Sequence, residues 1–545
     1  YLLFSTGKDT SICICTFFYY PIFFAFVNTT LKSQNNENPD KFTSIYYHVN
    51  WPSPGDPMNL ANPQENGARV SYYGVTYVPQ SNLDGNYYNG SASGWSMSTV
   101  NNRYNMPSPV EVAVQHWLSP GEDSVYSTVL VKCLSPLTGT LIAHNVIIEK
   151  WIHFNFAPGS NGEKDFYNVM KKMLPNQNGT QLPTELAAGD YYIIEGAWKF
   201  GTVYDKTQIA AVGFVQNKNT KEIFNTANSS VDQIDLPFDN DLEVMEINNI
   251  PSKTCKNKIT PVIRVRNNGA NTVTSMTIKY RVNDGQIASH SWSGSLGSLK
   301  KATITLPEYE YSILSSNDLV VYTNNPNSVA DEYPKNDTLH FTMVPAPVTT
   351  NTIKLVLRTD NNPAETSWEF RNSLGQVVQA SPVYSIPNKL YQENYTMPEA
   401  DCYTFTIFDA GGNGICCSNG TGVYEISSNG VVIKQGGAFA SAESSEFLMA
   451  ATVGLQEVAS EASVNVFPNP ASGELTVSVS QPVAGKATLK MISAVGKLII
   501  SKDLGWLNSG THETKIDVSD IPGGVYLVQV ESGFGKITRK VSVVR

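Results

Sequence analysis

Alternation of apolar and polar residues is the dominant pattern along the chain, and it predicts β-strands over most of its length. In the run from Met276 to Val282 every second residue is apolar, as expected for a strand with one buried face. Turn signals such as Asn267-Asn-Gly269 and Asn283-Asp-Gly285 separate such runs. Short strands joined by turns of this kind are typical of antiparallel β-sandwiches.

Residues 162–174 depart from this alternation. Their apolar members are Phe166, Val169, Met170, Met173 and Leu174. This spacing of three and four predicts one apolar helix face, and Pro175 fits the end of such a helix. We therefore expect one helix inserted among the strands of this region.

The first 107 residues mix strand and helix signals. The pair Cys13-Ile-Cys15 precedes a strand-like segment at 42–49 and another strand that ends at Val78-Pro79. A strand, a cysteine pair opening a helix, a second strand and a Val-Pro strand together predict a thioredoxin-like α/β unit. In such folds the proline faces the reactive cysteines, so we expect a cis Val78–Pro79 bond beside Cys13 and Cys15.

Changes of pattern and two linkers predict five domains in the 545 residues, and the fold class is mainly β with one α/β unit. The expected domains are a thioredoxin-like unit (1–107), a β-sandwich with the inserted helix (108–232), an immunoglobulin-like domain (240–345), an accessory β-sandwich (351–449) and a small C-terminal β-sandwich (463–545).

Composition narrows the classes of function. The formal net charge is −10, which argues against a nucleic-acid partner. No stretch has 18 consecutive apolar residues, so no transmembrane span is predicted. The chain opens at Tyr1 without features of a signal peptide, and we interpret it as a fragment or processed form whose export signal lies upstream.

The last 80 or so residues carry a set of motifs in a fixed order. The motif positions are Pro468, Asn469, Pro470, Gly473, Gly496, Lys497, Gly524 and Tyr526. In order and spacing this segment resembles the type IX secretion C-terminal sorting domain. The resemblance implies a Gram-negative bacterium of the Bacteroidetes group and recognition by the type IX translocon. It also implies secretion or attachment to the outer-membrane surface, usually with removal of the domain and linkage to lipopolysaccharide.

The front half resembles a second family. The segments Tyr46-Tyr-His-Val-Asn-Trp51, Arg69-Val-Ser-Tyr-Tyr73 and Val78-Pro79 are similar to those of the outer membrane protein twenty-eight related family. The resemblance covers roughly residues 1–230. It implies a thioredoxin-like domain joined to a β-sandwich on an exported protein, and it carries the active-site proline over to Pro79.

The cysteine pair decides whether this unit is an enzyme. A thiol-disulfide oxidoreductase needs a thiolate at a helix N-terminus and a resolving cysteine, usually spaced C-x-x-C. Cys13-Ile-Cys15 is one residue short of that spacing. Two interpretations stay open, namely a vestigial scaffold and a redox enzyme in which Cys13, Cys15 and Pro79 are catalytic.

The accessory sandwich holds a glycine-rich loop and three cysteines. Asp409 and Asn413 bring carboxylate and amide oxygens together, which is consistent either with a calcium site or with a turn held by glycines. Cys402 is expected to form a disulfide with Cys416 or Cys417, because an exported protein meets an oxidising compartment.

No motif of a metalloprotease, a serine hydrolase or a nucleotide-binding loop occurs in the sequence. We therefore expect a non-catalytic surface or secreted protein that binds an extracellular protein or glycan, with calcium as its one conceivable cofactor. The alternative is a secreted thioredoxin-like oxidoreductase.

Overall fold

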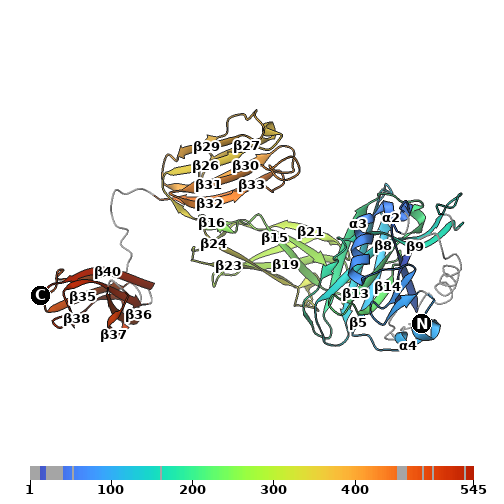
Figure 1. Cartoon of the computed structure of the whole chain (residues 1–545), viewed down its shortest axis with the longest axis horizontal. Coiled ribbons are helices and arrows are strands. Elements are labelled where there is room, and N and C mark those ends of the chain that lie inside the picture. Colours follow the sequence, from blue (N-terminus) through green and yellow to red (C-terminus); the bar gives the residue numbers. More distant parts are fainter. Residues whose placement is uncertain are drawn as a thin grey trace. The chain divides into compact units, whose positions relative to one another are not determined.

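Strands dominate the computed structural model, which describes residues 13–19, 41–51, 54–91, 93–159, 162–450, 463–481, 484–493, 496–532 and 535–545 (Figure 1). Contacts divide the chain into two units. The first consists of residues 1–250, 258–312 and 317–342, and the second of residues 251–257, 313–316 and 343–545. Within the described residues, no helix is both long enough and apolar enough to cross a bilayer.

A nine-stranded sheet is the centre of the first unit. Its order is β14 (Ile223–Asn228), β13 (Ile209–Asn217), β8 (Leu141–His153), β9 (Asp165–Leu174), β2 (Phe42–His48), β1 (Cys13–Tyr19), β3 (Gln80–Leu83) and β4 (Tyr88–Ser91), and β10 (Thr180–Gln181) pairs with β8. Strand β2 is parallel to both β1 and β9, whereas β3 is antiparallel to β1 and to β4. One sheet therefore contains strands from both sides of the domain boundary expected at residue 107.

The two faces of this sheet are covered differently. Helices α2 (Pro57–Ala61) and α3 (Pro63–Tyr73) lie on one face, where Tyr73 packs with Tyr47 and Phe214. Helix α4 (Met97–Tyr104) contributes Val100 to a neighbouring cluster. A second sheet covers the other face, in the order β12 (Tyr191–Lys199), β6 (Ser124–Cys133) and β5 (Val110–Leu118).

The helix expected over residues 162–174 is wrong, because Asp165–Leu174 form strand β9. The prediction failed because both faces of the sheet are covered at β9. In β9 the polar residues Asn168 and Lys171 are buried together with the apolar ones, so the alternation that marks a half-exposed strand is lost. The apolar residues that remain happen to have helical spacing.

Most of the next module also belongs to the first unit, and the end of β24 (Thr338–Pro345) belongs to the second. One sheet contains β15 (Leu242–Asn248), β18 (Val262–Asn267) and β21 (Lys301–Thr305), and another contains β24, β23 (Asn317–Asn324), β19 (Val273–Val282) and β20 (Ala288–Leu296). Met276, Ile278, Tyr280 and Val282 are all buried in β19, which confirms the predicted alternation.

Short elements complete the first unit and its connection to the second. They are β7 (Leu137–Thr138), β11 (Glu185–Leu186), β16 (Lys253–Thr254), β17 (Lys258–Ile259), β22 (Tyr309–Glu310) and the 3-10 turns η1 (Lys206–Gln208) and η2 (Pro326–Ser328). Strand β16 pairs in parallel with Val344 and Pro345 at the end of β24.

A two-sheet sandwich follows in the second unit. One sheet has the order β25 (Val348–Thr349), β33 (Ala442–Met449), β30 (Asp401–Asp409), β27 (Thr366–Arg371) and β28 (Val377–Ala380). The other has the order β29 (Leu390–Thr396), β26 (Thr352–Arg358), β31 (Val423–Ser428) and β32 (Val431–Gly436), and η3 (Pro363–Glu365) precedes β27. The core is aromatic, with Trp368, Phe405 and Tyr424 buried between the sheets.

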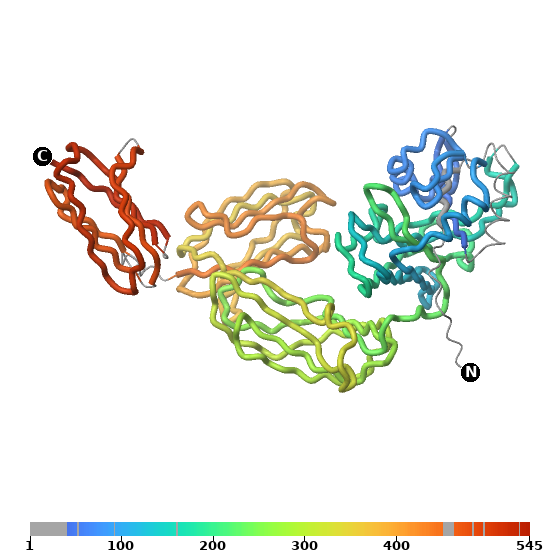
Figure 2. Tube along the Cα trace, turned by 90° about the horizontal axis from the view of Figure 1, so that it is seen from below, coloured from blue at the N-terminus to red at the C-terminus, as the bar shows by residue number. Residues whose placement is uncertain are grey.

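Residues 463–545 form a separate sandwich, whose Cα trace can be followed in red in Figure 2. Its sheets are β34 (Ser463–Phe467), β35 (Glu474–Gln481) and β38 (Gly510–Asp517), and β37 (Leu498–Leu507), β36 (Gly485–Ser493), β39 (Gly524–Ser532) and β40 (Gly535–Val543). Alternate residues such as Val477, Leu489 and Val528 fill its core, and every member of that core lies within the same 83 residues.

Candidate functional site

The N-terminal cysteine pair lies inside a strand. Cys13 and Cys15 belong to β1, where Cys13 pairs with Phe42 and Cys15 with Leu83. The expectation that the pair opens a helix is therefore wrong. The apolar, aromatic sequence of residues 13–19 favours a strand, and a strand does not offer the helix N-terminus that lowers a thiol pKa.

The Val78–Pro79 bond is cis, as predicted. Pro79 comes directly before β3, whose first residue pairs with Phe18, whereas Cys15 pairs with Leu83 at the other end. Leu83 lies four positions after Pro79, which is about 13 Å along a strand at 3.3 Å per residue. The register therefore contradicts the predicted contact between Pro79 and the two cysteines.

The cysteines of the accessory sandwich are oxidised, but not in the predicted pairing. Cys402 is bonded to Cys255, and Cys416 to its neighbour Cys417. The expected bond from Cys402 to Cys416 or Cys417 is wrong because Cys402 is the second residue of β30, whereas the glycine-rich loop follows the last residue of that strand, Asp409. Asp409 lies seven positions after Cys402, which is about 23 Å along the strand.

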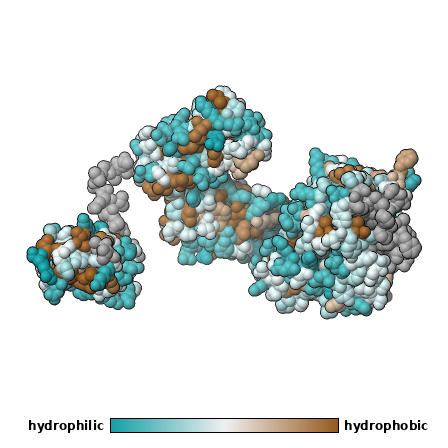
Figure 3. Space-filling view, viewed as in Figure 1, coloured by the Kyte–Doolittle hydropathy of each residue, from teal (hydrophilic) through white to brown (hydrophobic). Residues whose placement is uncertain are grey.

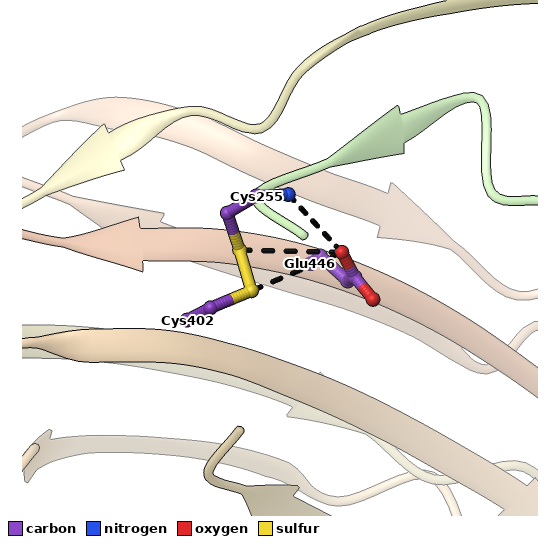
Figure 4. A group of neighbouring side chains, drawn as sticks. All are labelled: Cys255, Cys402 and Glu446. Carbon is purple, nitrogen blue, oxygen red and sulfur yellow. Dashed lines mark hydrogen bonds between the residues drawn. A yellow bond between two sulfur atoms is a disulfide. The ribbon is translucent and has the colours of Figure 1, made fainter. Parts of the chain in front are cut away.

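Glu446 lies beside the Cys255–Cys402 bond, as Figure 4 shows. Its carboxylate accepts hydrogen bonds from the Thr254 hydroxyl at 2.7 Å and from the Cys255 amide at 3.2 Å. Lys256 forms an ion pair with it at 3.0 Å. These contacts fix residues 254–256 against β33, so the group is a structural anchor. In the oxidised state it offers no thiolate to a metal.

Three buried groups of the first unit have side chains that can take part in catalysis, but two of them are paired with carboxylates and the third is a buried thiol. His48 Nδ1 lies 2.7 Å from Asp56, with both side chains almost fully buried. Lys171 lies 3.1 Å from Glu149, equally buried, and burial lowers the pKa of Lys171 although Glu149 raises it. Cys133 is a buried free thiol, and burial raises its pKa. Each group is held away from solvent.

A polar cavity of about 350 Å³ lies between strand β12 and the β15–β18 sheet, within the first unit. Arg266 is its main cation. The guanidinium contacts Glu243 at 2.5 Å, Glu195 at 2.9 Å and the Asn268 side chain at 2.7 Å. At the rim, Asp190 contacts Lys335 at 2.5 Å and accepts a hydrogen bond from the Tyr333 hydroxyl at 3.1 Å.

Sequence reasoning missed this cavity because its members come from segments far apart along the chain. Asn267-Asn-Gly269 was interpreted only as a turn, although the Asn268 side chain is buried and donates a hydrogen bond to Tyr191 Oη at 2.9 Å. The volume falls within the range of small-ligand sites. Its acids and bases are nevertheless paired with one another, and the network is best explained as the polar packing of two sheets.

Asp241 lies at the buried end of this network. Its carboxylate accepts a hydrogen bond from the Tyr191 hydroxyl and another from the Asn336 amide at 2.9 Å. Burial raises the pKa of Asp241 to about 6, although these hydrogen bonds lower it. Between about pH 4 and pH 6 the folded chain therefore holds a proton that the unfolded chain releases.

This proton predicts a pH dependence of stability. As the pH rises from 4 to 6, the free energy of unfolding should fall, on the order of 2–3 kcal/mol for a shift of about two pH units. The variant Asp241→Asn cannot lose a proton, so its melting temperature relative to the wild-type chain should be higher at pH 7 than at pH 4. Calorimetry at the two pH values measures the difference. Asp239→Asn, at an exposed acid nearby, is the control and should show no such change.

The loop after β30 contains the predicted calcium ligands. Asp409 is buried, and its Oδ2 accepts hydrogen bonds from the amides of Asn413 and Gly414 at 2.9 and 3.0 Å. Asn413 donates from its side chain to the Gly414 carbonyl at 3.1 Å. The structure therefore places the two predicted residues on one loop, with the Asp409 carboxylate turned toward the loop backbone.

The motif residues of the C-terminal sandwich hold its turns and its chain ends. Asn469 donates to the Lys540 carbonyl at 3.1 Å and accepts from the Ser542 amide at 2.8 Å, with Pro468 and Pro470 on either side. Gly496 has a positive φ of 82° in the turn that continues to Lys497.

The remaining motif positions bind backbone groups in the same way. The Gly473 carbonyl accepts from the Val518 amide at 2.7 Å, and the Tyr526 hydroxyl donates to the Pro522 carbonyl at 2.7 Å beside Gly524. Asn469, Gly473, Gly496 and Tyr526 therefore each have a structural role within this sandwich.

The solved structures that resemble parts of this chain have low TM-scores and low sequence identity. A protein of Agrobacterium tumefaciens is 10% identical with a TM-score of 0.29, over 42% of this chain and 99% of that one. A CARDB domain from Pyrococcus furiosus is 21% identical with a TM-score of 0.18, over 21% and 95%. A tandem repeat from the extending region of a large adhesion protein is 11% identical with a TM-score of 0.13, over 80% and 100%. Scores of this size carry no information about function.

No curated protein matches the chain. One family does, and it is described as the secretion system C-terminal sorting domain. The match covers residues 465–544, which are the C-terminal sandwich described above. This tail implies handling by the type IX secretion system and a secreted or surface location. The chain thus ends in a type IX sorting domain.

Proposed function

We propose that the chain works outside the cell as a non-catalytic adhesion or ligand-binding protein of a Gram-negative bacterium. The observation that carries the proposal is the sorting domain, joined to a chain built of β-modules. Export places those modules where an extracellular protein or glycan is the available partner. The proposal includes removal of the sorting domain and attachment to surface lipopolysaccharide, as the sorting-domain resemblance implies.

The burial and pairing of the reactive side chains support a binding function and not a catalytic one. Among the described residues, His48, Lys171 and Cys133 are buried, and four other cysteines form disulfides. On the face seen in Figure 3, apolar residues (brown) form small patches within a polar surface (teal). Single exposed side chains such as Val383 and Trp506 belong to this pattern, which is ordinary for modules surrounded by solvent.

The thioredoxin-like character of residues 1–107 is part of the proposal. It is supported by the parallel pair β1–β2 and by the pairing of β1 with β3, the strand that follows Val78-Pro79. The cysteines inside β1 favour a scaffold over a redox enzyme. In this interpretation the unit carries surface for binding and performs no thiol-disulfide exchange.

A binding experiment tests the function directly. The purified full chain is applied to arrays of glycans and extracellular-matrix proteins, with residues 463–545 alone as the control for binding by the sorting domain. We expect the full chain, and not the control, to retain a defined group of ligands. Insulin reduction by the full chain that is lost in Cys13→Ser, together with empty arrays, would contradict the proposal and favour the oxidoreductase.

A further inference from the structure

Two buried side chains meet at the end of strands β27 and β30 in the second unit. Thr366 is the first residue of β27 and pairs directly with Asp409, the last residue of β30. Directly paired residues place their side chains on the same face of a sheet. Thr366 is 3% exposed and Asp409 2%, so the two polar groups lie together in the interior beside the loops that flank these strands.

Both side chains keep an oxygen without a partner. Asp409 Oδ1 and Thr366 Oγ1 are buried and form no hydrogen bond with any described residue. The other oxygen of Asp409 already accepts the amides of Asn413 and Gly414, which fixes the carboxylate at the base of the loop. A buried carboxylate oxygen without a donor is costly, so this geometry calls for a positive group that the described residues do not supply.

Two more side-chain oxygens, from Glu365 and Asn413, lie close to Gly411 in the same loop. A side-chain carbon at position 411 would lie 2.5 Å from Glu365 Oε2 and 2.9 Å from Asn413 Oδ1. The Asn362 amide is the one donor to that Glu365 oxygen in the described structure, at a long 3.4 Å. The Ala410 amide donates to the Glu365 carbonyl at 2.9 Å, which ties the β27 and β30 loops together.

The negative charge of Asp409 and Glu365 is not balanced by a basic side chain of the described residues. In the described part of this sandwich, basic side chains form ion pairs with Glu369, Glu443 and Glu446. Asp409 and Glu365 are in none of the ion pairs of the described residues. Two carboxylates at one loop, with no cationic side chain of the described residues beside them, favour a cation from solution.

We propose that this loop binds one calcium ion through Asp409 Oδ1, the Glu365 carboxylate and Asn413 Oδ1, with the Thr366 hydroxyl beside them. Calcium takes six to eight oxygen ligands and accepts irregular geometry, so backbone carbonyls and water complete its shell. The nearby Cys416 and Cys417 are bonded to each other and offer no thiolate, which disfavours zinc. The site is independent of the proposed adhesion, and it adds a cofactor to the exported chain.

Titration of the full chain with calcium chloride, after removal of metal with a chelator, tests the proposal. We expect calorimetry to detect one site, with a dissociation constant in the range of extracellular modules, roughly 10⁻⁴–10⁻³ M. Asp409→Asn and Glu365→Gln should each weaken binding by roughly tenfold or more. Glu425→Gln removes a carboxylate from β31 of the same sandwich and should leave the affinity unchanged.

The variants also separate loss of folding from loss of binding. Glu365 is partly exposed, so Glu365→Gln should keep the melting temperature of the metal-free protein even if Asp409→Asn does not. Absence of calcium binding by the wild-type chain up to about 10 mM would overturn the proposal, since extracellular sites saturate below that concentration. Equal affinity of wild type and Glu365→Gln would overturn it too, by placing the ion elsewhere.

Discussion

Removing residues 463–545 is expected to leave the rest of the chain in the periplasm and to abolish most of its appearance at the cell surface. The physical reason is that the segment matched by the sorting-domain family lies wholly inside this deletion. The core of the deleted sandwich is self-contained, from Val464 to Val543, so its removal does not open the core of another module. Cell fractionation and protease accessibility on intact cells measure the change.

Two controls make this result specific. Trp506→Ala changes an exposed side chain of β37 outside the motif, and it should leave export at the normal level. Fusion of residues 463–545 to a periplasmic reporter should bring that reporter to the surface. Normal surface amounts of the truncated chain would show that the export signal lies elsewhere and would remove the main support for an extracellular function.

The sorting domain could be predicted from the sequence because its strands and turns are marked by neighbouring residues. Strands such as 475–479 alternate strictly, since one face packs on the core and the other meets water. Its motif residues sit in turns, where a proline, a glycine or an asparagine is required for a backbone reason such as the positive φ of Gly496. The same alternation correctly predicted the buried face of β19.

Sequence reasoning failed where contacts are long-range. Strand β9 is buried on both faces, and its buried Lys171 is explained only by Glu149 on the neighbouring strand β8. The Arg266 network joins residues of three separate segments, and no local pattern identifies Glu195 as a partner. The glycine-rich loop was identified from composition, whereas Glu365 and Thr366 were not, because strand pairing brings them there.

Breaking the Cys255–Cys402 bond should destabilise the sandwich of residues 352–449 by between about 2 and 5 kcal/mol. The bond links positions 147 residues apart, and a cross-link over such a long loop restricts the unfolded chain strongly. The double variant Cys255→Ser, Cys402→Ser removes the restriction without leaving a free thiol. Glu446 keeps its hydrogen bond from Thr254, so the local contacts of the anchor survive in part.

The second disulfide provides a matched comparison. Cys416 and Cys417 are neighbours, so their bond closes no long loop, and the variant Cys416→Ser, Cys417→Ser should cost much less. Hydrogen exchange followed by mass spectrometry, read on peptides from residues 352–449, measures the stability of this sandwich without interference from the other modules. Equal protection in the two double variants would contradict the loop-closure explanation. Greater exchange in Cys255→Ser, Cys402→Ser alone would establish that the long-range bond, missed by sequence reasoning, is the one that stabilises the module.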